Sequence, residues 1–347
     1  MDKIKMSSES RIAHLNEVLA SLKIPADCVA YNNNRHFSYY DLELKPGCRV
    51  KKIHNLSSEI ALAVKSRTEP IIKTIPEKGI VRLQMIHDEP EIIPLSEIME
   101  TPPTKAGLPF LFGMTEEASS LWVNMVDNPH LLVAGATNSG KSVTLHTIIK
   151  NALDKSNVDI YLVDTKKVEF QVYTNPKIRN RIHKVANSQT SAIATLSFLC
   201  DMMEQRYETM AQLNYVNIEQ CSTLFNRTLV VMDEVADLMV NDKQKVFENY
   251  VVRLAQKGRA CGIYLVLATQ RPSVNVLTGL IKANFPARMA CRVATGIDSK
   301  VILDQTGAQN LIGKGDALFL SPEQDLVRLQ VAFTNPEDTV KDYLARV

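Results

Sequence analysis

The 347-residue sequence predicts an α/β protein built on a largely parallel sheet, preceded by a smaller α/β module. Short apolar runs alternate with segments of helical periodicity, as in chains that form βαβ units. The runs are apolar at successive positions, which is typical of strands covered by helices on both faces. The predicted strands are His130–Ala134, Val158–Val163, Leu229–Met232, Ile263–Ala268, Arg288–Cys291 and Ala317–Leu320. The predicted helices are Ser142–Leu153, Ser191–Leu213, Gln244–Gln256 and Val276–Ala283.

The composition is that of an ordinary globular protein. Apolar residues make up 45% and charged residues 22%, which excludes a disordered or collagen-like chain. With 40 Lys and Arg against 38 Asp and Glu, the net charge is +2, so any binding to nucleic acid must come from local basic loops. The six cysteines lack metal-ligand spacing and predict reduced thiols. No apolar stretch has the length of a signal peptide or a membrane span, so we expect a soluble, cytoplasmic protein without direct membrane insertion.

A change of composition predicts where the chain divides. Two prolines and a glycine in Thr101–Gly107 interrupt regular structure. We therefore expect an N-terminal helix or extension over residues 1–23 and a small α/β companion domain over residues 24–105. The remaining residues, 106–347, are expected to form one large domain.

The small module shows both helical and strand patterns. Apolar spacing predicts a helix near Ser10–Lys23 and another over Leu56–Lys65. Alternating residues predict two strands on either side of a turn at Pro76–Gly79. This module has no obvious catalytic set, and its pattern is typical of a packing or oligomerisation element.

A glycine-rich loop is the first chemical feature of the large domain. Gly135–Ser142 reads GATNSGKS and fits G-x-x-x-x-G-K-[ST] between a predicted strand and a predicted helix. Its backbone N–H groups and the helix N-terminus suit the phosphates of ATP, Lys141 can reach the β- and γ-phosphates, and the Ser142 hydroxyl can bind Mg²⁺. The alternative is a glycine-rich turn before a helix. The expected nucleotide contacts are Gly135, Ala136, Thr137, Asn138, Ser139, Gly140, Lys141, Ser142 and Val143.

Two further predicted strands end in polar residues that suit hydrolysis. Asp233 is expected to hold Mg²⁺, usually through water, and Glu234 to polarise the attacking water. The alternative is a surface acidic pair that follows a core strand. Gln270 ends another strand at the carboxyl edge of the sheet, where it can touch both the γ-phosphate and the water. A polar loop residue is the alternative there.

Together these residues resemble the motor domain of the FtsK/SpoIIIE family of double-stranded DNA translocases. The similar stretches are NPHLLVAGATNSGKSVTLHTIIKNAL, VVMDEVADLMV, RLAQKGRACGIYLVLATQRPSVNVLTGLIKANFPARMA and IDSKVILDQTGAQNLIGKGDALF. The resemblance covers roughly Cys48 to Phe333 and includes the small module. The Asp-Glu-x-Ala-Asp and Ala-Thr-Gln-Arg-Pro-Ser runs are more specific than a phosphate loop alone.

The resemblance implies a RecA-like P-loop ATPase motor domain with a smaller companion domain. It also implies a homohexameric ring around duplex DNA, with ATP held between subunits. Such a site takes a cation from the neighbouring subunit, because charge builds on the γ-phosphate. In the family this arginine lies in a Lys-x-Arg-Ala segment, here Lys257–Ala260, so Arg259 is the candidate trans-acting finger. Arg253 and Arg271 are weaker alternatives, and Arg259 could instead be a solvated cation at a helix end.

Contacts to DNA are also implied by the resemblance. Arg271, Lys282 and Lys300 match positions that carry basic side chains in the family's DNA-facing loops. A motor that moves along any sequence should bind phosphates rather than read bases. A solvated surface cation is the alternative for each of the three. Gly296 stands where the family often has a lysine, so we expect some backbone contact to be lost or taken over by another residue.

The leading hypothesis is therefore an ATP-driven translocase on double-stranded DNA. The sequence lacks the membrane region and the winged-helix domain of the family's cell-division members, since only one helical segment, Pro336–Ala345, follows the predicted strand LVRLQVAF. It thus suggests an isolated motor for DNA transfer, segregation or packaging by a mobile element or virus, with a recombinase, a loading factor or transfer machinery as candidate partners. One alternative is a secretion or conjugation coupling ATPase that engages a protein substrate. Another is a nucleotide-regulated scaffold, which has no evident need for Glu234.

Overall fold

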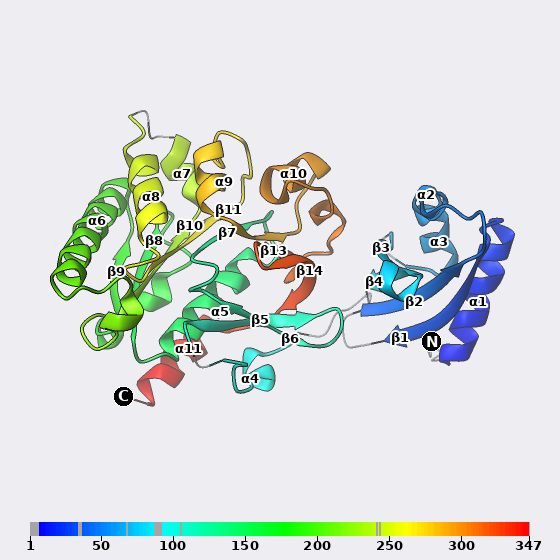
Figure 1. The fold of residues 1–347 in the computed structure, drawn as a ribbon, viewed down its shortest axis with the longest axis horizontal. Coiled ribbons are helices and arrows are strands. Elements are labelled where there is room, and N and C mark those ends of the chain that lie inside the picture. Colours follow the sequence, from blue (N-terminus) through cyan, green and yellow to red (C-terminus); the bar gives the residue numbers. More distant parts are fainter. Residues whose placement is uncertain are drawn as a thin grey trace. The chain divides into compact units, whose positions relative to one another are not determined.

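The chain forms two compact units, Met1–Ile92 and Ile93–Val347. The computed structural model describes residues 7–33, 37–66, 69–86, 92–104, 106–240, 242 and 244–346. Both units are drawn in Figure 1. No helix among these residues is long and apolar enough to cross a membrane.

The smaller unit is an antiparallel sheet in the order β1-β2-β4-β3, packed with helices. Leu15 and Leu19 of the first helix are buried with Leu42 and Leu83 of the sheet. That helix therefore shares the core of this unit and is not a separate extension. Both predicted helices and the β3–β4 hairpin are confirmed, whereas β1 and β2 were not predicted. The elements are α1 (Ser8–Ser21), β1 (Ala26–Asn33), β2 (Phe37–Leu44), α2 (Val50–Asn55), α3 (Ser57–Ala63), β3 (Ile71–Ile75) and β4 (Ile80–Ile86).

The larger unit contains a mixed sheet in the order β6-β5-β14-β13-β12-β7-β11-β10-β8-β9. The strands from β12 to β9 in this order are parallel, and the strands from β13 to β6 are antiparallel. The parallel-rich α/β architecture is confirmed, with β5, β6 and β9 as additions that were not predicted. The strands are β5 (Pro109–Thr115), β6 (Ser120–Asn124), β7 (His130–Ala134), β8 (Val158–Asp164), β9 (Ile182–Ala186), β10 (Arg227–Asp233), β11 (Ile263–Thr269), β12 (Ala287–Cys291), β13 (Asp316–Ser321) and β14 (Gln324–Val331).

Helices cover both faces of this sheet (Figure 1). One face packs against α6, α8 and α9, and the other against α5 and α11. All the predicted helices of this unit are present, and α4, α7 and α10 were not predicted. The helices are α4 (Leu95–Ile98), α5 (Lys141–Leu153), α6 (Gln189–Gln212), α7 (Val235–Val240), α8 (Val246–Lys257), α9 (Gly279–Asn284), α10 (Gly296–Leu303) and α11 (Pro336–Leu344).

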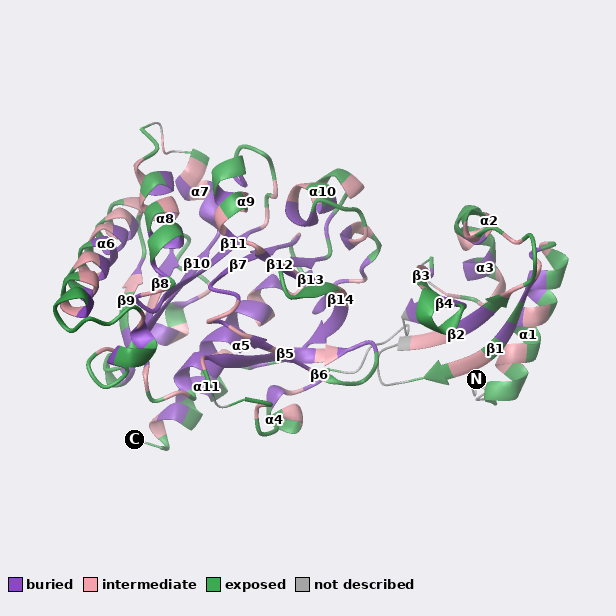
Figure 2. Cartoon of the chain, viewed as in Figure 1, coloured by how far each residue is buried: buried purple, intermediate pink, exposed green. Residues whose placement is uncertain are grey.

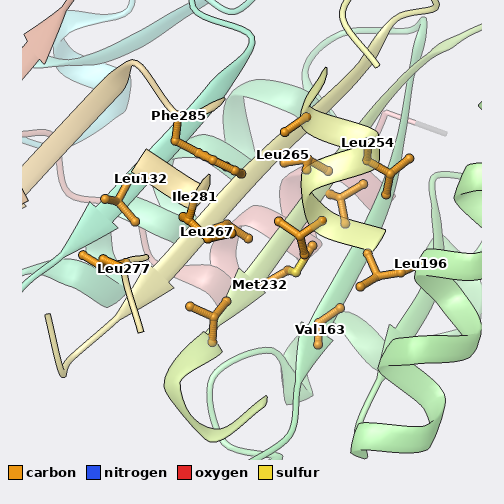
Figure 3. Close-up of a cluster of buried hydrophobic side chains, with 14 of the residues drawn as sticks. Leu132, Val163, Leu196, Met232, Leu254, Leu265, Leu267, Leu277, Ile281 and Phe285 are labelled. Carbon is orange, nitrogen blue, oxygen red and sulfur yellow. The ribbon is translucent and has the colours of Figure 1, made fainter. Parts of the chain in front are cut away.

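The central parallel strands are buried on both faces (Figure 2). Leu265 and Leu267 of β11 point into the cluster formed with α6, α8 and α9, where Figure 3 shows Leu254 beside Leu265. Val266, between the two leucines, points into the opposite cluster with α5. This alternation explains why the strand sequence is continuously apolar, because each successive side chain enters one of two cores.

The segment before β5 belongs to the larger unit. Phe333 N–H donates to Ile93 O at 2.7 Å, and Leu95 N–H donates to Phe333 O at 2.9 Å. Leu95 also packs with Leu111 and Ala332. These contacts put the division between Ile92 and Ile93, so the boundary expected between residues 105 and 106 lies inside the larger unit. The prolines of Thr101–Gly107 interrupt a connection within the unit and do not separate the two units.

His130, the first residue of β7, makes the stability of the larger unit sensitive to acid. Its side chain is 1% exposed, and its Nδ1 accepts a hydrogen bond from Leu265 N–H at 3.2 Å. Burial, with a smaller effect from the Arg259 charge, lowers the pKa of His130 from 6.5 to about 3. Between these two values the unfolded chain binds a proton that the folded chain does not.

We therefore predict that the free energy of unfolding falls as the pH is lowered below about 6.5. His130→Asn, which keeps a hydrogen-bond acceptor, should reduce the slope of unfolding free energy against pH by up to about 1.4 kcal/mol per pH unit. Urea unfolding between pH 5 and pH 7 measures this, followed by the fluorescence of the one tryptophan in the sequence, Trp122 of β6. Equal slopes for the variant and the wild type would contradict the assignment.

Candidate functional site

The glycine-rich loop joins β7 to α5 as predicted. Gly135 N–H donates to Thr269 O at 3.2 Å, and Ala136 N–H donates to Arg292 O at 2.8 Å, so the loop is tied to the ends of both neighbouring strands. Gly140, just before α5, has a φ of 111°. A Cβ at Gly140 would lie 2.4 Å from the backbone nitrogen of Gly315, which requires glycine there. The loop thus brings the N–H groups of the first turn of α5, which lack acceptors inside the helix, to the carboxyl edge of the sheet.

A second loop supports the first. Lys314 N–H donates to Asn138 O at 3.3 Å, and Gly315 N–H donates to Ser139 O at 3.0 Å. This second loop is in turn held by a buried ion pair between Asp316 and Arg328, with Nη2 2.7 Å from Oδ2. The antiparallel strands β13 and β14 therefore fix the shape of the glycine-rich loop. Sequence reasoning did not predict this contact.

Lys141 and Asp233 form a buried ion pair at the centre of the site. Lys141 begins α5 and Asp233 ends β10, and their side chains are 3% and 6% exposed. Lys141 Nζ donates to Asp233 Oδ1. Burial raises the pKa of Asp233, and the Lys141 charge opposes this rise. The loop lysine and the strand-end aspartate, predicted from separate motifs, are therefore in direct contact.

Glu234 is held in one orientation beside this pair. Its backbone has a φ of 52°, in the left-handed region, and it is 1% exposed. Thr269 Oγ1 donates to Glu234 Oε1 at 2.8 Å, and Gln270 N–H lies 3.2 Å from Oε2. Lys166 Nζ, in the loop after β8, lies 3.4 Å from Oε2. The carboxylate is thus fixed between the ends of β10, β11 and β8.

Gln270 connects Glu234 to the glycine-rich loop. Its backbone N–H contacts Glu234, and its side-chain Oε1 accepts a hydrogen bond from Thr137 Oγ1 at 3.2 Å. The structure therefore brings together Lys141, Asp233, Glu234 and Gln270, all at the carboxyl edge of the parallel strands, where open α/β sheets bind ligands.

Three residues that the sequence did not single out form a hydrogen-bonded series that begins at Ser142. Ser142 Oγ donates to Glu169 Oε2 at 2.6 Å, and His146 Nε2 lies 2.8 Å from Glu169 Oε1. His146 Nδ1 lies 3.1 Å from the hydroxyl of Tyr173. Burial alone would raise the pKa of Glu169, but the hydrogen bonds from His146 and Ser142 lower it below its usual value. Glu169 follows β8 by five residues in an irregular loop, so no periodic pattern points to it.

Ser142 and Asp233 fit a magnesium ion that is bound together with a nucleotide. Both offer hard oxygen donors, and Mg²⁺ in such sites uses one or two protein oxygens together with phosphates and water. In the part of the chain that the structure describes, no three Asp, Glu, His or Cys side chains converge as metal ligands. The donor set therefore suits a cation bound mainly by phosphate and water, not by a closed protein cage.

Arg259 lies at the opposite edge of the sheet from these residues. It is exposed in the turn between α8 and β11, whereas Thr269 and Gln270 follow at the other end of β11. A seven-residue strand spans about 20 Å, so Arg259 cannot reach the site of its own chain. Of the two alternatives, Arg253 pairs with Glu204 of α6 at 3.0 Å, and Arg271 is exposed directly after Gln270.

The residues expected to contact DNA differ in their exposure to solvent and in their ion pairs. Arg271 is exposed and lines a hollow of about 300 Å³ with Gln270 and Asp298 of α10. Lys300 is exposed on α10. Lys282 is 22% exposed and forms an ion pair with Asp304, which also pairs with Arg288. A Cβ at Gly296 would have its nearest neighbour at 3.4 Å, so the backbone there would accept a side chain.

Two family models match this chain. A family model described as the FtsK/SpoIIIE family matches residues 95–229 and 223–274, and a model described as the FtsK alpha domain matches residues 2–85. The first covers the glycine-rich loop, Asp233, Glu234 and Gln270. The second covers most of the smaller unit.

Relatives over most of the chain carry matching names. The DNA translocase FtsK of Clostridium acetobutylicum is 36% identical over 341 residues, covering 93% of this chain and 44% of that protein. The DNA translocase SftA of Bacillus subtilis is 34% identical over 340 residues, covering 93% of this chain and 35% of that protein. The chain thus spans less than half the length of these two relatives.

Solved structures share the fold at lower identity. The conjugation coupling protein TcpA of pCW3 has a TM-score of 0.69 and 23% identity, covering 97% of this chain and 99% of that one. The type VII secretion ATPase EccC of Thermomonospora curvata has a TM-score of 0.59 and 20% identity, covering 72% of this chain and 32% of that one. The fold is therefore that of P-loop ATPase motor domains. With the glycine-rich loop and strand-end acids in place and family models matching both units, the chain belongs to the FtsK/SpoIIIE family.

Proposed function

We propose that this chain hydrolyses ATP to move along double-stranded DNA as a ring of identical subunits. The observation that carries this proposal is the convergence of Lys141, Asp233, Glu234 and Gln270 at one edge of the sheet in a member of the FtsK/SpoIIIE family. We further propose that the protein acts in the cytoplasm, where DNA and ATP occur together. DNA transfer, segregation or packaging would be the context, with a recombinase, a loading factor or transfer machinery as partner.

The site supplies each role that ATP hydrolysis needs. The loop from Gly135 to Val143 would hold the phosphates with its N–H groups, and Lys141 would exchange its carboxylate partner for a phosphate oxygen. Ser142 and Asp233 would hold Mg²⁺, which when bound neutralises phosphate charge. Glu234 would orient and polarise the attacking water. Gln270 would sense the γ-phosphate, because it contacts both the loop and Glu234.

The position of Arg259 supports a ring. A strand of about 20 Å separates Arg259 from the site of its own chain, so as the arginine finger it would have to serve the site of a neighbouring subunit. A hexamer is the assembly we propose, as the family resemblance implies. Each nucleotide would then lie between two subunits, and hydrolysis at one site would change the contacts of both subunits.

Contact with DNA is assigned to the loops beyond Gln270. Arg271 directly follows the residue proposed to sense the γ-phosphate and shares a hollow with α10, which carries Lys300. A change at Gln270 on hydrolysis would therefore move cations suited to DNA phosphates. Lys282 is paired with Asp304, so it would contact DNA either after this ion pair opens or as part of the pair.

One prediction distinguishes a double-stranded DNA substrate from a protein substrate. With ATP, the protein should displace a third strand from duplex DNA, and duplex should stimulate its ATPase activity with a steep decrease at higher salt. A triplex-displacement assay measures this directly. Stimulation by a protein substrate and not by duplex would favour a secretion or conjugation coupling ATPase instead.

A second prediction concerns the proposed base. Glu234→Gln should bind ATP with unchanged affinity but hydrolyse it slower by about 10²–10⁴-fold, because the amide cannot accept the proton of the water. Nucleotide binding and phosphate release measured on the same preparation test this. Glu208→Gln, exposed on α6, is the matched control and should retain full turnover. Normal turnover of Glu234→Gln would show that Glu234 is not the general base.

A third prediction concerns the shared site. Arg259→Ala should lower turnover by about 10³–10⁵-fold without loss of ATP binding. Mixing it with Lys141→Ala subunits should restore part of the activity, because composite sites then have both residues. Arg253→Ala, at the alternative candidate on α8, should stay active, and loss of turnover in Arg253→Ala but not in Arg259→Ala would assign the role to Arg253. If mixing restores nothing, the trans assignment of Arg259 fails.

A further inference from the structure

We propose that Glu169 is a positioning residue that orients the Ser142 hydroxyl toward a divalent cation, with His146 and Tyr173 holding Glu169 in place. The inference rests on the proposed ATP hydrolysis at this site and adds residues that its motifs do not contain. It assigns a role to the hydrogen-bonded series Ser142–Glu169–His146–Tyr173, which links α5 to the loop after β8.

The geometry of α5 places two members of the series on one face. Ser142 and His146 are four residues apart in the helix, so their side chains lie one above the other. Glu169 contacts both, with one carboxylate oxygen 2.6 Å from Ser142 Oγ and the other 2.8 Å from His146 Nε2. Each oxygen of the carboxylate is therefore committed to one residue of α5.

The chemistry of a serine hydroxyl makes this arrangement useful. The hydroxyl has one hydrogen to donate and two lone pairs on the oxygen. A hydrogen bond to Glu169 uses the hydrogen and leaves the lone pairs for a metal ion. It also raises the electron density of the oxygen, as outer partners of metal ligands do.

The rest of the series fixes the orientation of Glu169. The carboxylate offers only acceptor atoms, so His146 Nε2 donates to it, and His146 Nδ1 lies 3.1 Å from the Tyr173 hydroxyl. Tyr173 is 1% exposed, and burial raises its pKa, so its hydroxyl keeps its proton. Its ring packs beside Phe170, the residue after Glu169. The loop that carries Glu169 is therefore anchored at both the ring and the hydroxyl of Tyr173.

The test measures metal binding and not turnover. Mn²⁺ is titrated into the protein with a non-hydrolysable ATP analogue and followed by electron paramagnetic resonance. Glu169→Gln should weaken Mn²⁺ binding by about 10–100-fold. Binding of the analogue in EDTA should stay at the wild-type value, because the loop N–H groups and Lys141 are unchanged. Glu208→Gln is the matched control and should behave as wild type in both measurements.

A second variant distinguishes an effect on metal binding from a general loss of folding. Tyr173→Phe removes only the last hydroxyl of the series and should weaken Mn²⁺ binding in the same direction, by less than Glu169→Gln. If Glu169→Gln loses nucleotide binding in EDTA, Tyr173→Phe decides the question. Wild-type Mn²⁺ affinity in the variants that bind nucleotide overturns this inference and leaves the proposed function intact. Absence of nucleotide binding by the wild type overturns both.

Discussion

The buried ion pair of Lys141 and Asp233 is the interaction around which the site of this protein is organised. An ammonium and a carboxylate, each nearly without solvent, are stable there only because they compensate each other. Their contact requires the glycine-rich loop, the start of α5 and the end of β10 to meet at one edge of the sheet. Removal of either charge would leave the other buried and uncompensated. A phosphate group that takes over Lys141 would leave Asp233 without a cationic partner, so nucleotide should bind more tightly with a divalent metal than without one.

The parallel strands also separate two groups of residues that have proposed roles in ATP hydrolysis. Glu234 and Gln270 lie where β10 and β11 end, whereas Arg259 lies where β11 begins. A rigid strand, buried on both faces, connects the proposed site of one subunit to the group that it would lend to the next. The strand keeps these two groups of residues about 20 Å apart.

The antiparallel half of the sheet supports the glycine-rich loop. The Asp316–Arg328 pair of β13 and β14 holds the loop at Lys314 and Gly315, and that loop donates two backbone hydrogen bonds to the glycine-rich loop. The close approach explains why Gly140 and Gly315 face each other without side chains. Strands β13 and β14, which do not carry the proposed catalytic carboxylates, thus support the curved shape of the loop.

The sequence by itself determined the parallel strands other than β9, the helices α5, α6, α8, α9 and α11, and the motif residues Lys141, Asp233, Glu234 and Gln270. It could do so because strands buried on both faces are continuously apolar, and because a phosphate loop needs glycines and a lysine at fixed spacing. The tertiary structure alone decided the contacts of Glu169 with Ser142, of Lys314 with Asn138, and of Ile93 with Phe333. It also decided the pairing of β5 and β6, where Pro109 and Gly113 interrupt the strand pattern. These features join residues that are distant in the chain or lie in irregular loops, and no local periodicity records such contacts.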